Sequence, residues 1–245
     1  MQLFNVTGLR AEIVRPGKNL TAWAAEHQPF AVCNASLYTA AREPIGTIIE
    51  DGAMVHNDGN GFGCGVSVRG GCLGFGMPWG QAWTDYITGY NAPVQQGKYV
   101  APAFADSYVF GCRLARIGVG RAAGKTLIVT DDYVTLQEFA QHAIAAGFDT
   151  LVNLDGGGSR HLFYDGKTVY TSGRIPYNAI AFYATEGPEN DPVGEPGENG
   201  HAAVFRWACE QGMLTGGVDD PVTKGDLAAA LKAMDERIRS ESDTK

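Results

Sequence analysis

Glycine places the strongest constraint on how this chain can fold. It accounts for 33 of the 245 residues, and many of these glycines stand in pairs or short clusters. Glycine accepts positive φ angles without steric cost, so such clusters favour tight turns between short strands. The sequence therefore predicts a domain built mostly from β-structure rather than a bundle of long helices.

One helix nevertheless stands out, over residues 135–146. Its apolar residues recur at the spacing that puts them on one helical face, and they are Leu136, Phe139, Ala140, Ala143 and Ile144. Thr135 and Glu138 have the spacing of a capping box, in which each side chain bonds the other residue's backbone N–H. Gly147 is placed to end the helix.

Short strands surround this helix. Apolar runs predict strands at residues 30–34, 126–130, 150–154 and 178–183. Asp-Gly pairs at residues 51–52 and 165–166 separate further apolar runs, which is typical of β-hairpins. We therefore expect an α+β fold: a mostly β main domain with few helices, followed by a small C-terminal helical hairpin.

Composition divides the chain into three parts. Residues 1–185 carry the strand and turn pattern and form the expected main domain. Residues 186–200 contain three prolines, four glycines, five acidic residues and no aromatic residue. A segment of that composition cannot bury a core and is expected to be a linker. Residues 201–245 are expected to form a helical appendage.

Charge and targeting signals exclude several classes of protein. The net charge of −8 and the pI near 5.1 argue against general nucleic-acid binding, which needs a basic face. No apolar run is long enough to cross a bilayer, and the N-terminus lacks the pattern of a signal peptide. We expect synthesis in the cytoplasm. The five cysteines and five histidines show no metal-ligand spacing, so no metal and no cofactor is expected.

The segment with the clearest chemical content is Asn-Leu-Asp-Gly-Gly-Gly-Ser at residues 153–159. Consecutive glycines can present backbone N–H groups to an anion without interference from side chains. Ser159 adds a hydroxyl donor, and Asp155 stands where the preceding strand ends. A plain β-turn with a solvated aspartate is the alternative. A dinucleotide-binding loop would require a helix after the glycines, whereas a strand is expected there.

This segment resembles the hallmark of the phosphodiester glycosidase family, which it matches without a gap. Weaker similarities to the family follow in the family's order. They are an early strand at residues 31–38, an arginine strand at 116–120 (with Arg113 as an alternative register), Asp131 with the helix after it, and a closing stretch at 173–180. The resemblance covers residues 29–183. It implies hydrolysis of the sugar C1–O bond of a glycosyl-1-phosphodiester, of which an N-acetylglucosamine 1-phosphodiester is the expected kind.

Candidate roles follow from this implied reaction. A carboxylate is needed to stabilise the oxocarbenium-like centre or to activate water, and Asp155 and Asp131 are the candidates. The departing phosphate needs guanidinium and N–H donors. The expected substrate and phosphate ligands are Arg116, Arg174, Gly156, Gly157, Gly158, Ser159, Asn178 and Asn34. For the arginines and asparagines, solvated strand positions and turn hydrogen bonds remain the alternative.

The chain also departs from the family pattern. Arg160 and His161 replace the small residues usual after the glycine run, which predicts a different pocket rim. Ala35 and Ser36 replace glycines in the early strand. These changes leave the sugar and the aglycone open.

The C-terminal part resembles a partial S-layer homology repeat, from Phe205 to Ala228. That resemblance implies a cell-wall polysaccharide as partner. Together with the lack of a signal peptide, it suggests a bacterial or phage-encoded protein that is released or virion-associated. A helical hairpin that docks on its own domain, or that makes an oligomer, is the alternative. For the whole chain, the competing functions are a non-catalytic cell-surface glycan-binding module and a metal-dependent phosphodiesterase that would cleave P–O rather than C–O.

Overall fold

A computed structural model gives the fold and describes residues 1–57, 64–76, 85–89, 91–101 and 111–184. The chain divides into two units, Met1–Glu186 and Gly187–Lys245, and all the described residues belong to the first. The expected linker and the expected C-terminal helical hairpin lie outside the described residues. The following description therefore concerns the first unit.

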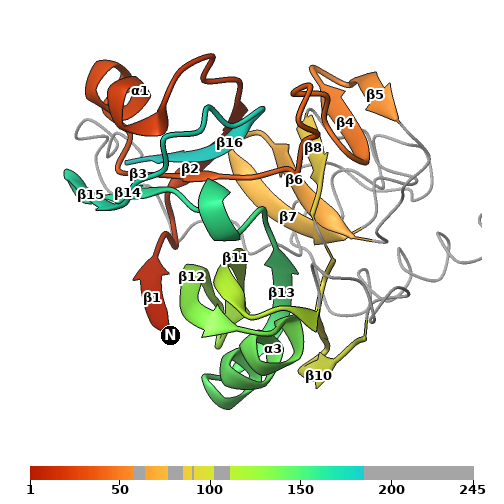
Figure 1. Cartoon of the computed structure of the whole chain (residues 1–245). Coiled ribbons are helices and arrows are strands. Elements are labelled where there is room, and N and C mark those ends of the chain that lie inside the picture. Colours follow the sequence, from red (N-terminus) through yellow and green to blue (C-terminus); the bar gives the residue numbers. More distant parts are fainter. Residues whose placement is uncertain (58–63, 77–84, 90, 102–110, 185–245) are drawn as a thin grey trace, which may run out of the picture. The chain divides into compact units, whose positions relative to one another are not determined.

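Three antiparallel sheets make up this unit (Figure 1). The first has the order β1 (Gln2–Asn5), β12 (Lys125–Val134), β11 (Leu114–Ala122), β13 (Phe148–Asn153), β9 (Val94–Gln95) and β10 (Lys98–Tyr99). The second has the order β15 (Lys167–Tyr170), β14 (Leu162–Tyr164), β3 (Ala31–Asn34), β16 (Ala179–Tyr183) and β2 (Arg10–Val14). The third has the order β5 (Ala53–Asn57), β4 (Thr47–Glu50), β8 (Asp85–Thr88), β6 (Gly65–Arg69) and β7 (Cys72–Gly76). The expectation of a mostly β domain with few helices is confirmed.

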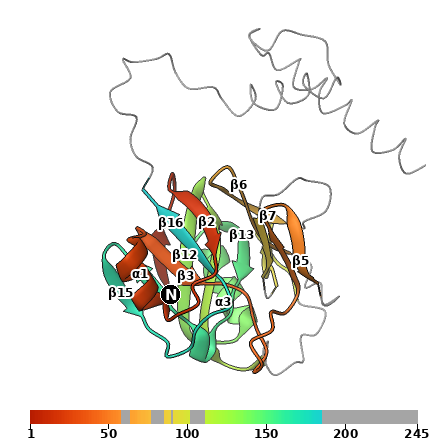
Figure 2. The ribbon, with the colours of Figure 1, turned by 90° about the horizontal axis from the view of Figure 1, so that it is seen from above.

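A central apolar core joins the three sheets. Each sheet contributes one face of alternating aliphatic side chains, as a half-buried strand must. Buried members include Ile117, Val119 and Val152 from the first sheet, Cys33 and Ile180 from the second, and Ile48, Val66 and Ile87 from the third. Strand β2 contacts β6 and β7, and Figure 2 shows these strands side by side from above. The sheets therefore form one packed body.

Helix α3 (Leu136–Ala145) covers the outer face of the six-stranded sheet (Figure 1). Both hydrogen bonds of the predicted capping box are present between Thr135 and Glu138. Gly147 has φ +87° just after the helix, a conformation that glycine adopts readily. The helix prediction is therefore confirmed.

Helix α1 (Leu20–His27) was not expected from the sequence. Asn19 begins it, because the Asn19 side chain accepts a hydrogen bond from the backbone N–H of Thr21. Its buried residues are Leu20, Trp23 and Ala24, which pack on Val32, Ala179 and Ala181 of the second sheet. Among the described residues no helix is long and apolar enough to cross a membrane.

The two predicted hairpins are present. Strands β4 and β5 pair across Asp51 and Gly52, both of which have positive φ angles, and β14 and β15 pair across Asp165 and Gly166. Such angles are what a tight hairpin turn requires. Among the cysteines, Cys33 and Cys64 are buried, whereas Cys72 at the start of β7 is exposed.

Candidate active site

Asp155 lies where the six-stranded sheet meets the second sheet. Strand β13 ends at Asn153, and Leu154 continues its ladder by donating its N–H to the carbonyl of Ile117 at 2.9 Å. The next N–H, that of Asp155, instead bonds the carbonyl of Ala35 just after β3 at 2.9 Å. The change of partner fixes the backbone of Asp155 between two sheets.

A side chain on any of the three glycines after Asp155 would meet a different obstacle. A Cβ on Gly156 would lie 2.5 Å from the carbonyl oxygen of Ala115, which is backbone and cannot move aside. Gly157 has φ +56°, which L-residues with side chains rarely adopt. A Cβ on Gly158 would lie 3.2 Å from Nη2 of Arg174. A Cβ on Gly158 would therefore require only a small shift of the Arg174 side chain, whereas Gly156 and Gly157 are restricted by backbone.

The turn itself is a single 3-10 turn over Gly157–Ser159, after which the chain enters strand β14. The absence of a long helix after the glycines removes the dinucleotide-loop alternative. The N–H of Ser159 is used within the turn, where it bonds the carbonyl of Gly156 at 3.0 Å. The N–H groups of Gly157 and Gly158 have no acceptor among the described residues, so they remain available to an anion.

Asp155, Ser159 and Arg174 form a chain of polar groups. The Ser159 hydroxyl accepts a hydrogen bond from Nη1 of Arg174 at 2.9 Å, and its interaction with the Asp155 side chain acts to lower the pKa of that carboxyl group. Burial raises the pKa of Asp155 to about 6, against the lowering effect of Ser159 and of the Arg174 charge. A carboxyl group whose pKa is shifted this far toward neutrality is typical of functional sites.

Ser172 holds Arg174 over the glycine turn. Its hydroxyl donates to the carbonyl of Gly158 at 2.7 Å and accepts the backbone N–H of Arg174 at 3.0 Å. The same residue donates its own N–H to Nδ1 of His161 at 3.2 Å. These bonds connect the loop that carries Arg174 with the loop that carries Asp155.

His161 supports this connection from inside the protein. We expected it at the pocket rim, but its exposed fraction is only 1%. Nδ1 accepts the N–H of Ser172, so the ring proton is on Nε2, which lies 3.2 Å from Oγ1 of Thr21 in α1. Burial lowers the pKa of His161 to about 4, and the ring is therefore neutral. The sequence offered no signal for this role beyond the departure from the family pattern.

Asn34 and Asn178 shape the site by bonding the backbone. Nδ2 of Asn34 donates to the carbonyl of Asp155 at 2.5 Å, and its Oδ1 accepts the N–H of His161 at 2.8 Å. Oδ1 of Asn178 accepts the N–H of Ser36 at 2.9 Å. Both asparagines are buried, with exposed fractions of 1% and 0%. In this structure they position the loops that carry the site.

Arg116, expected as a phosphate ligand, lies inside the sheet. It is 2% exposed, and its guanidinium donates to the carbonyls of Val134 and Cys112 at 3.3 and 2.9 Å. Buried guanidinium groups that bond carbonyls in this way stabilise the chain segments around them. The structure therefore gives the exposed Arg174, rather than Arg116, the position beside Asp155.

Asp131, expected as the second carboxylate, is engaged elsewhere. Asp131 is the residue opposite Arg116 in the pairing of β11 with β12. Its two carboxylate oxygens contact Nδ1 of His142 at 2.7 Å and the amino group of Met1 at 3.1 Å. Burial acts to raise the pKa of Asp131, but these partners outweigh it and lower the pKa. No contact in the described part of the chain joins its carboxylate to Asp155.

Arg160 also has partners away from Asp155. It contacts Asp132 at 2.5 Å and lies 3.7 Å from the centre of the Tyr170 ring. The described residues contain no group of three or more His, Cys, Asp or Glu side chains that could hold a metal ion.

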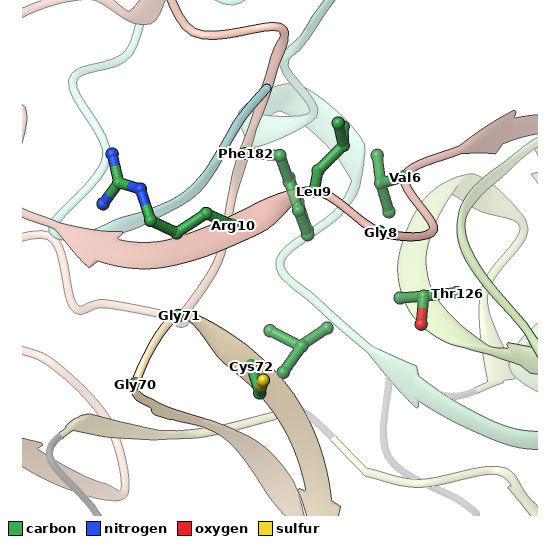
Figure 3. A pocket seen from close by; sticks show the side chains of 10 residues that line it. Val6, Gly8, Leu9, Arg10, Gly70, Gly71, Cys72, Thr126 and Phe182 are labelled. Carbon is green, nitrogen blue, oxygen red and sulfur yellow. The ribbon is translucent and has the colours of Figure 1, made fainter. Parts of the chain in front are cut away.

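A pocket of about 530 Å³ opens beside Arg174. Another, of about 400 Å³, lies between the first turn of the chain and β7, and it is lined by Val6, Thr126, Cys72 and Phe182 among others (Figure 3). Figure 3 shows the Arg10 guanidinium pointing away from Cys72, and it lies over the Tyr183 ring. Neither pocket has a carboxylate in its lining, but Arg174 in the larger one also contacts Ser159 near Asp155, so the chemistry is assigned to the Arg174 side.

Comparison with solved structures supports the fold. The catalytic domain of zebrafish N-acetylglucosamine-1-phosphodiester alpha-N-acetylglucosaminidase, auto-inhibited by its pro-peptide, is similar with a TM-score of 0.58 and 17% identity, over 71% of this chain and 73% of that one. A hypothetical protein from Synechocystis is similar with a TM-score of 0.61 and 13% identity, over 71% of this chain and 56% of that one. No protein with a curated description matches the chain in sequence.

A family model identifies the family to which the chain belongs. The phosphodiester glycosidase model matches residues 27–183, which include the strand β3, the glycine turn and the Arg174 loop. That range nearly coincides with the range in which the sequence resembled the family. The chain belongs to the phosphodiester glycosidase family.

Proposed function

We propose that this protein hydrolyses the C1–O bond of a glycosyl-1-phosphodiester and releases a free sugar and a phosphomonoester. The observation that carries the proposal is the contact series Asp155, Ser159 and Arg174. It puts a carboxyl group of raised pKa next to an exposed guanidinium, which are the two groups that this reaction requires. Family membership supports the reaction class.

The two groups serve opposite ends of the bond that breaks. As the bond between the anomeric carbon and the bridging oxygen lengthens, positive charge develops on the sugar and negative charge on the phosphate. Ionised Asp155 stabilises the sugar side or activates the water that adds to the anomeric carbon. Arg174, with the free N–H groups of Gly157 and Gly158, stabilises the departing phosphate.

The leaving group explains why one carboxylate can suffice. A phosphate is a far weaker base than a sugar alcohol, so its departure needs charge stabilisation more than protonation. Asp131 is then not needed as a general acid. We assign it a structural role, which agrees with its bonds to His142 and to the amino group of Met1.

The sugar that we propose is N-acetylglucosamine. The zebrafish relative is described as an enzyme for an N-acetylglucosamine 1-phosphodiester, and its fold is similar to that of this chain. The departures at Ala35, Ser36 and His161 concern loops around the site rather than Asp155 or Arg174. We therefore propose for this chain the same sugar as in the name of that relative, but we do not propose the same aglycone.

Hydrolysis in water enriched in the heavy oxygen isotope tests the proposal. Label in the released sugar is expected, because water adds to the anomeric carbon. Label in the phosphate would instead indicate a phosphodiesterase that cleaves P–O, and binding without turnover would indicate a glycan-binding module. Asp155→Asn serves as the inactive control, and Asp131→Asn as a matched control that also removes a buried carboxylate.

A further inference from the structure

The pocket beside Arg174 contains two arginines. It has a volume of about 530 Å³ and is lined by Tyr38, Thr39, Ala40, Arg42, Arg174 and Ile175. Binding sites for small molecules commonly have volumes of about 300–1,000 Å³. Arg174 lines this pocket and also contacts Ser159 near Asp155, so the pocket adjoins the candidate active site.

A tight turn brings Arg42 to this pocket. The N–H of Thr39 bonds the carbonyl of Glu43 at 2.8 Å, and the N–H of Arg42 bonds the carbonyl of Thr39 at 2.9 Å. Nη2 of Arg42 reaches the carbonyl of Ile175, the neighbour of Arg174, at 3.4 Å. The two guanidinium groups thus line one pocket from two different loops.

Neither arginine forms a salt bridge with a described residue, although the charge of Arg174 acts on the nearby Asp155. Within the described part of the chain no salt bridge involves Arg42 or Arg174, whereas Arg10, Arg15, Arg113 and Arg160 each have one. The protein as a whole carries a net charge of −8, whereas this pocket is lined by two arginines that form no salt bridge with a described residue. Such a pocket favours an anionic ligand. The hydroxyl of Tyr38, which also lines it, has no hydrogen-bond partner among the described residues.

We propose that this pocket binds the aglycone and that the aglycone carries a second anionic group, which Arg42 binds. The inference rests on the proposed function and specifies its substrate. The diester phosphate carries a single negative charge, which the guanidinium of Arg174 can match with paired hydrogen bonds. A second guanidinium in the adjoining pocket matches a further charge beyond the scissile bond. The substrate class is therefore an N-acetylglucosamine 1-phosphodiester of an acidic aglycone, such as a phosphorylated polyol.

Two substrates that differ only in the aglycone test this inference on the full chain. One is the methyl phosphodiester of N-acetylglucosamine, and the other is the phosphodiester of glycerol that bears a second, terminal phosphate. We expect wild-type kcat/KM to be roughly tenfold or more higher for the second substrate, as a charged hydrogen-bonded contact provides. Arg42→Gln should remove most of that preference.

Arg69→Gln is the matched control. It removes the same charge from an exposed arginine at the end of β6 that is not part of the pocket lining. We expect this variant to keep the wild-type preference between the two substrates. Loss of the preference in Arg69→Gln would mean that overall charge, and not the pocket, sets it.

Two results would overturn the inference. The first is a wild-type protein that cleaves both diesters equally well. The second is an Arg42→Gln variant that loses the same factor on both, which would mean that Arg42 and Arg174 bind the one scissile phosphate together.

Failure of the proposed function gives a different result. If the wild-type protein cleaves neither diester, calorimetry with glycerol 1,3-bisphosphate and with methyl phosphate still tests the pocket. Tighter binding of the bisphosphate that is lost in Arg42→Gln would support an anion pocket without the glycosidase reaction. Equal binding of the two probes would overturn the pocket as well.

Discussion

Two carboxylates flank strand β11 in the six-stranded sheet, Asp131 on β12 and Asp155 just beyond β13. The oxygens of Asp131 contact His142 and the amino group of Met1, and these partners lower its pKa although burial acts to raise it. The carboxyl group of Asp155 has Ser159 and the charge of Arg174 nearby, and burial raises its pKa to about 6.

We infer from this difference that Asp131 is a structural carboxylate and Asp155 a reactive one. A buried charge whose partners compensate its desolvation contributes to the fold and is a poor reagent. A carboxyl group that is incompletely compensated is less stable as an anion, and it interacts more strongly with a positive centre brought next to it. We therefore propose different roles for these two aspartates, which lie on either side of β11.

The most severe test of the comparison is Asp155→Asn. We expect kcat on a sugar 1-phosphodiester to fall by ~10²–10⁴-fold, since the group that acts on the anomeric centre is lost. The melting temperature should stay the same or rise, because the raised pKa means that the folded protein disfavours the anion. Steady-state kinetics and thermal unfolding by circular dichroism measure both. A folded variant with near-normal kcat would remove Asp155 from the mechanism.

The pH dependence should separate the two carboxylates. If ionised Asp155 is required, kcat/KM should fall about tenfold per pH unit below its pKa of about 6, or roughly 100-fold at pH 4. Protonation of Asp155 relieves a cost in the folded state, so this loss precedes unfolding. The stability due to Asp131 is present above its unfolded pKa and is lost only as pH falls through its lowered pKa. Activity that rises toward pH 4 would indicate that Asp155 works as an acid.

Arg174→Lys tests the phosphate side of the same site. Lysine keeps the charge but cannot grip two oxygens at once. We expect kcat/KM on a sugar 1-phosphodiester to fall by roughly 10- to 150-fold, the range for a lost charged hydrogen-bond pair. On an activated aryl glycoside without phosphate the loss should be small, provided that such a substrate is cleaved. Equal losses on both substrates would show that Arg174 supports the fold instead.

Asp131→Asn should have the smallest effect on catalysis. We expect unfolding free energy to fall by about 1–3 kcal/mol, because His142 and the amino group of Met1 lose their anionic partner. The fraction that stays folded should keep most of its kcat/KM. Chemical denaturation together with active-site-normalised kinetics measures the two separately. A loss of kcat as large as that of Asp155→Asn would restore Asp131 as a catalytic residue.

Local signals in the sequence were sufficient for much of the fold. The capping box of α3 and the Asp-Gly hairpins could be predicted because a few neighbouring residues determine each of them. Helix α1 could not, since it has only eight residues and its stability comes from packing on the second sheet. The apolar pattern of so short a segment carries little information on its own.

The site shows a similar division. The glycine turn and Asp155 could be recognised from contiguous residues, and Arg174 from its place in the closing stretch. The buried positions of Arg116 and Asp131 depend on contacts with Val134, Cys112 and His142, which no local pattern reveals. The role of His161 likewise depends on Thr21 and Ser172, which are distant in the sequence.

The bonds that hold Arg174 over the glycine turn also bear on how turnover ends. Ser172 accepts the backbone N–H of Arg174 and Ser159 accepts its guanidinium, so residues of the protein itself set the position that we propose for phosphate binding. The released phosphomonoester carries about −1.5 to −2 charges at neutral pH, more than the diester from which it came. It should therefore compete with fresh substrate for Arg174. Sustained turnover would then depend on a second activity that removes the phosphomonoester.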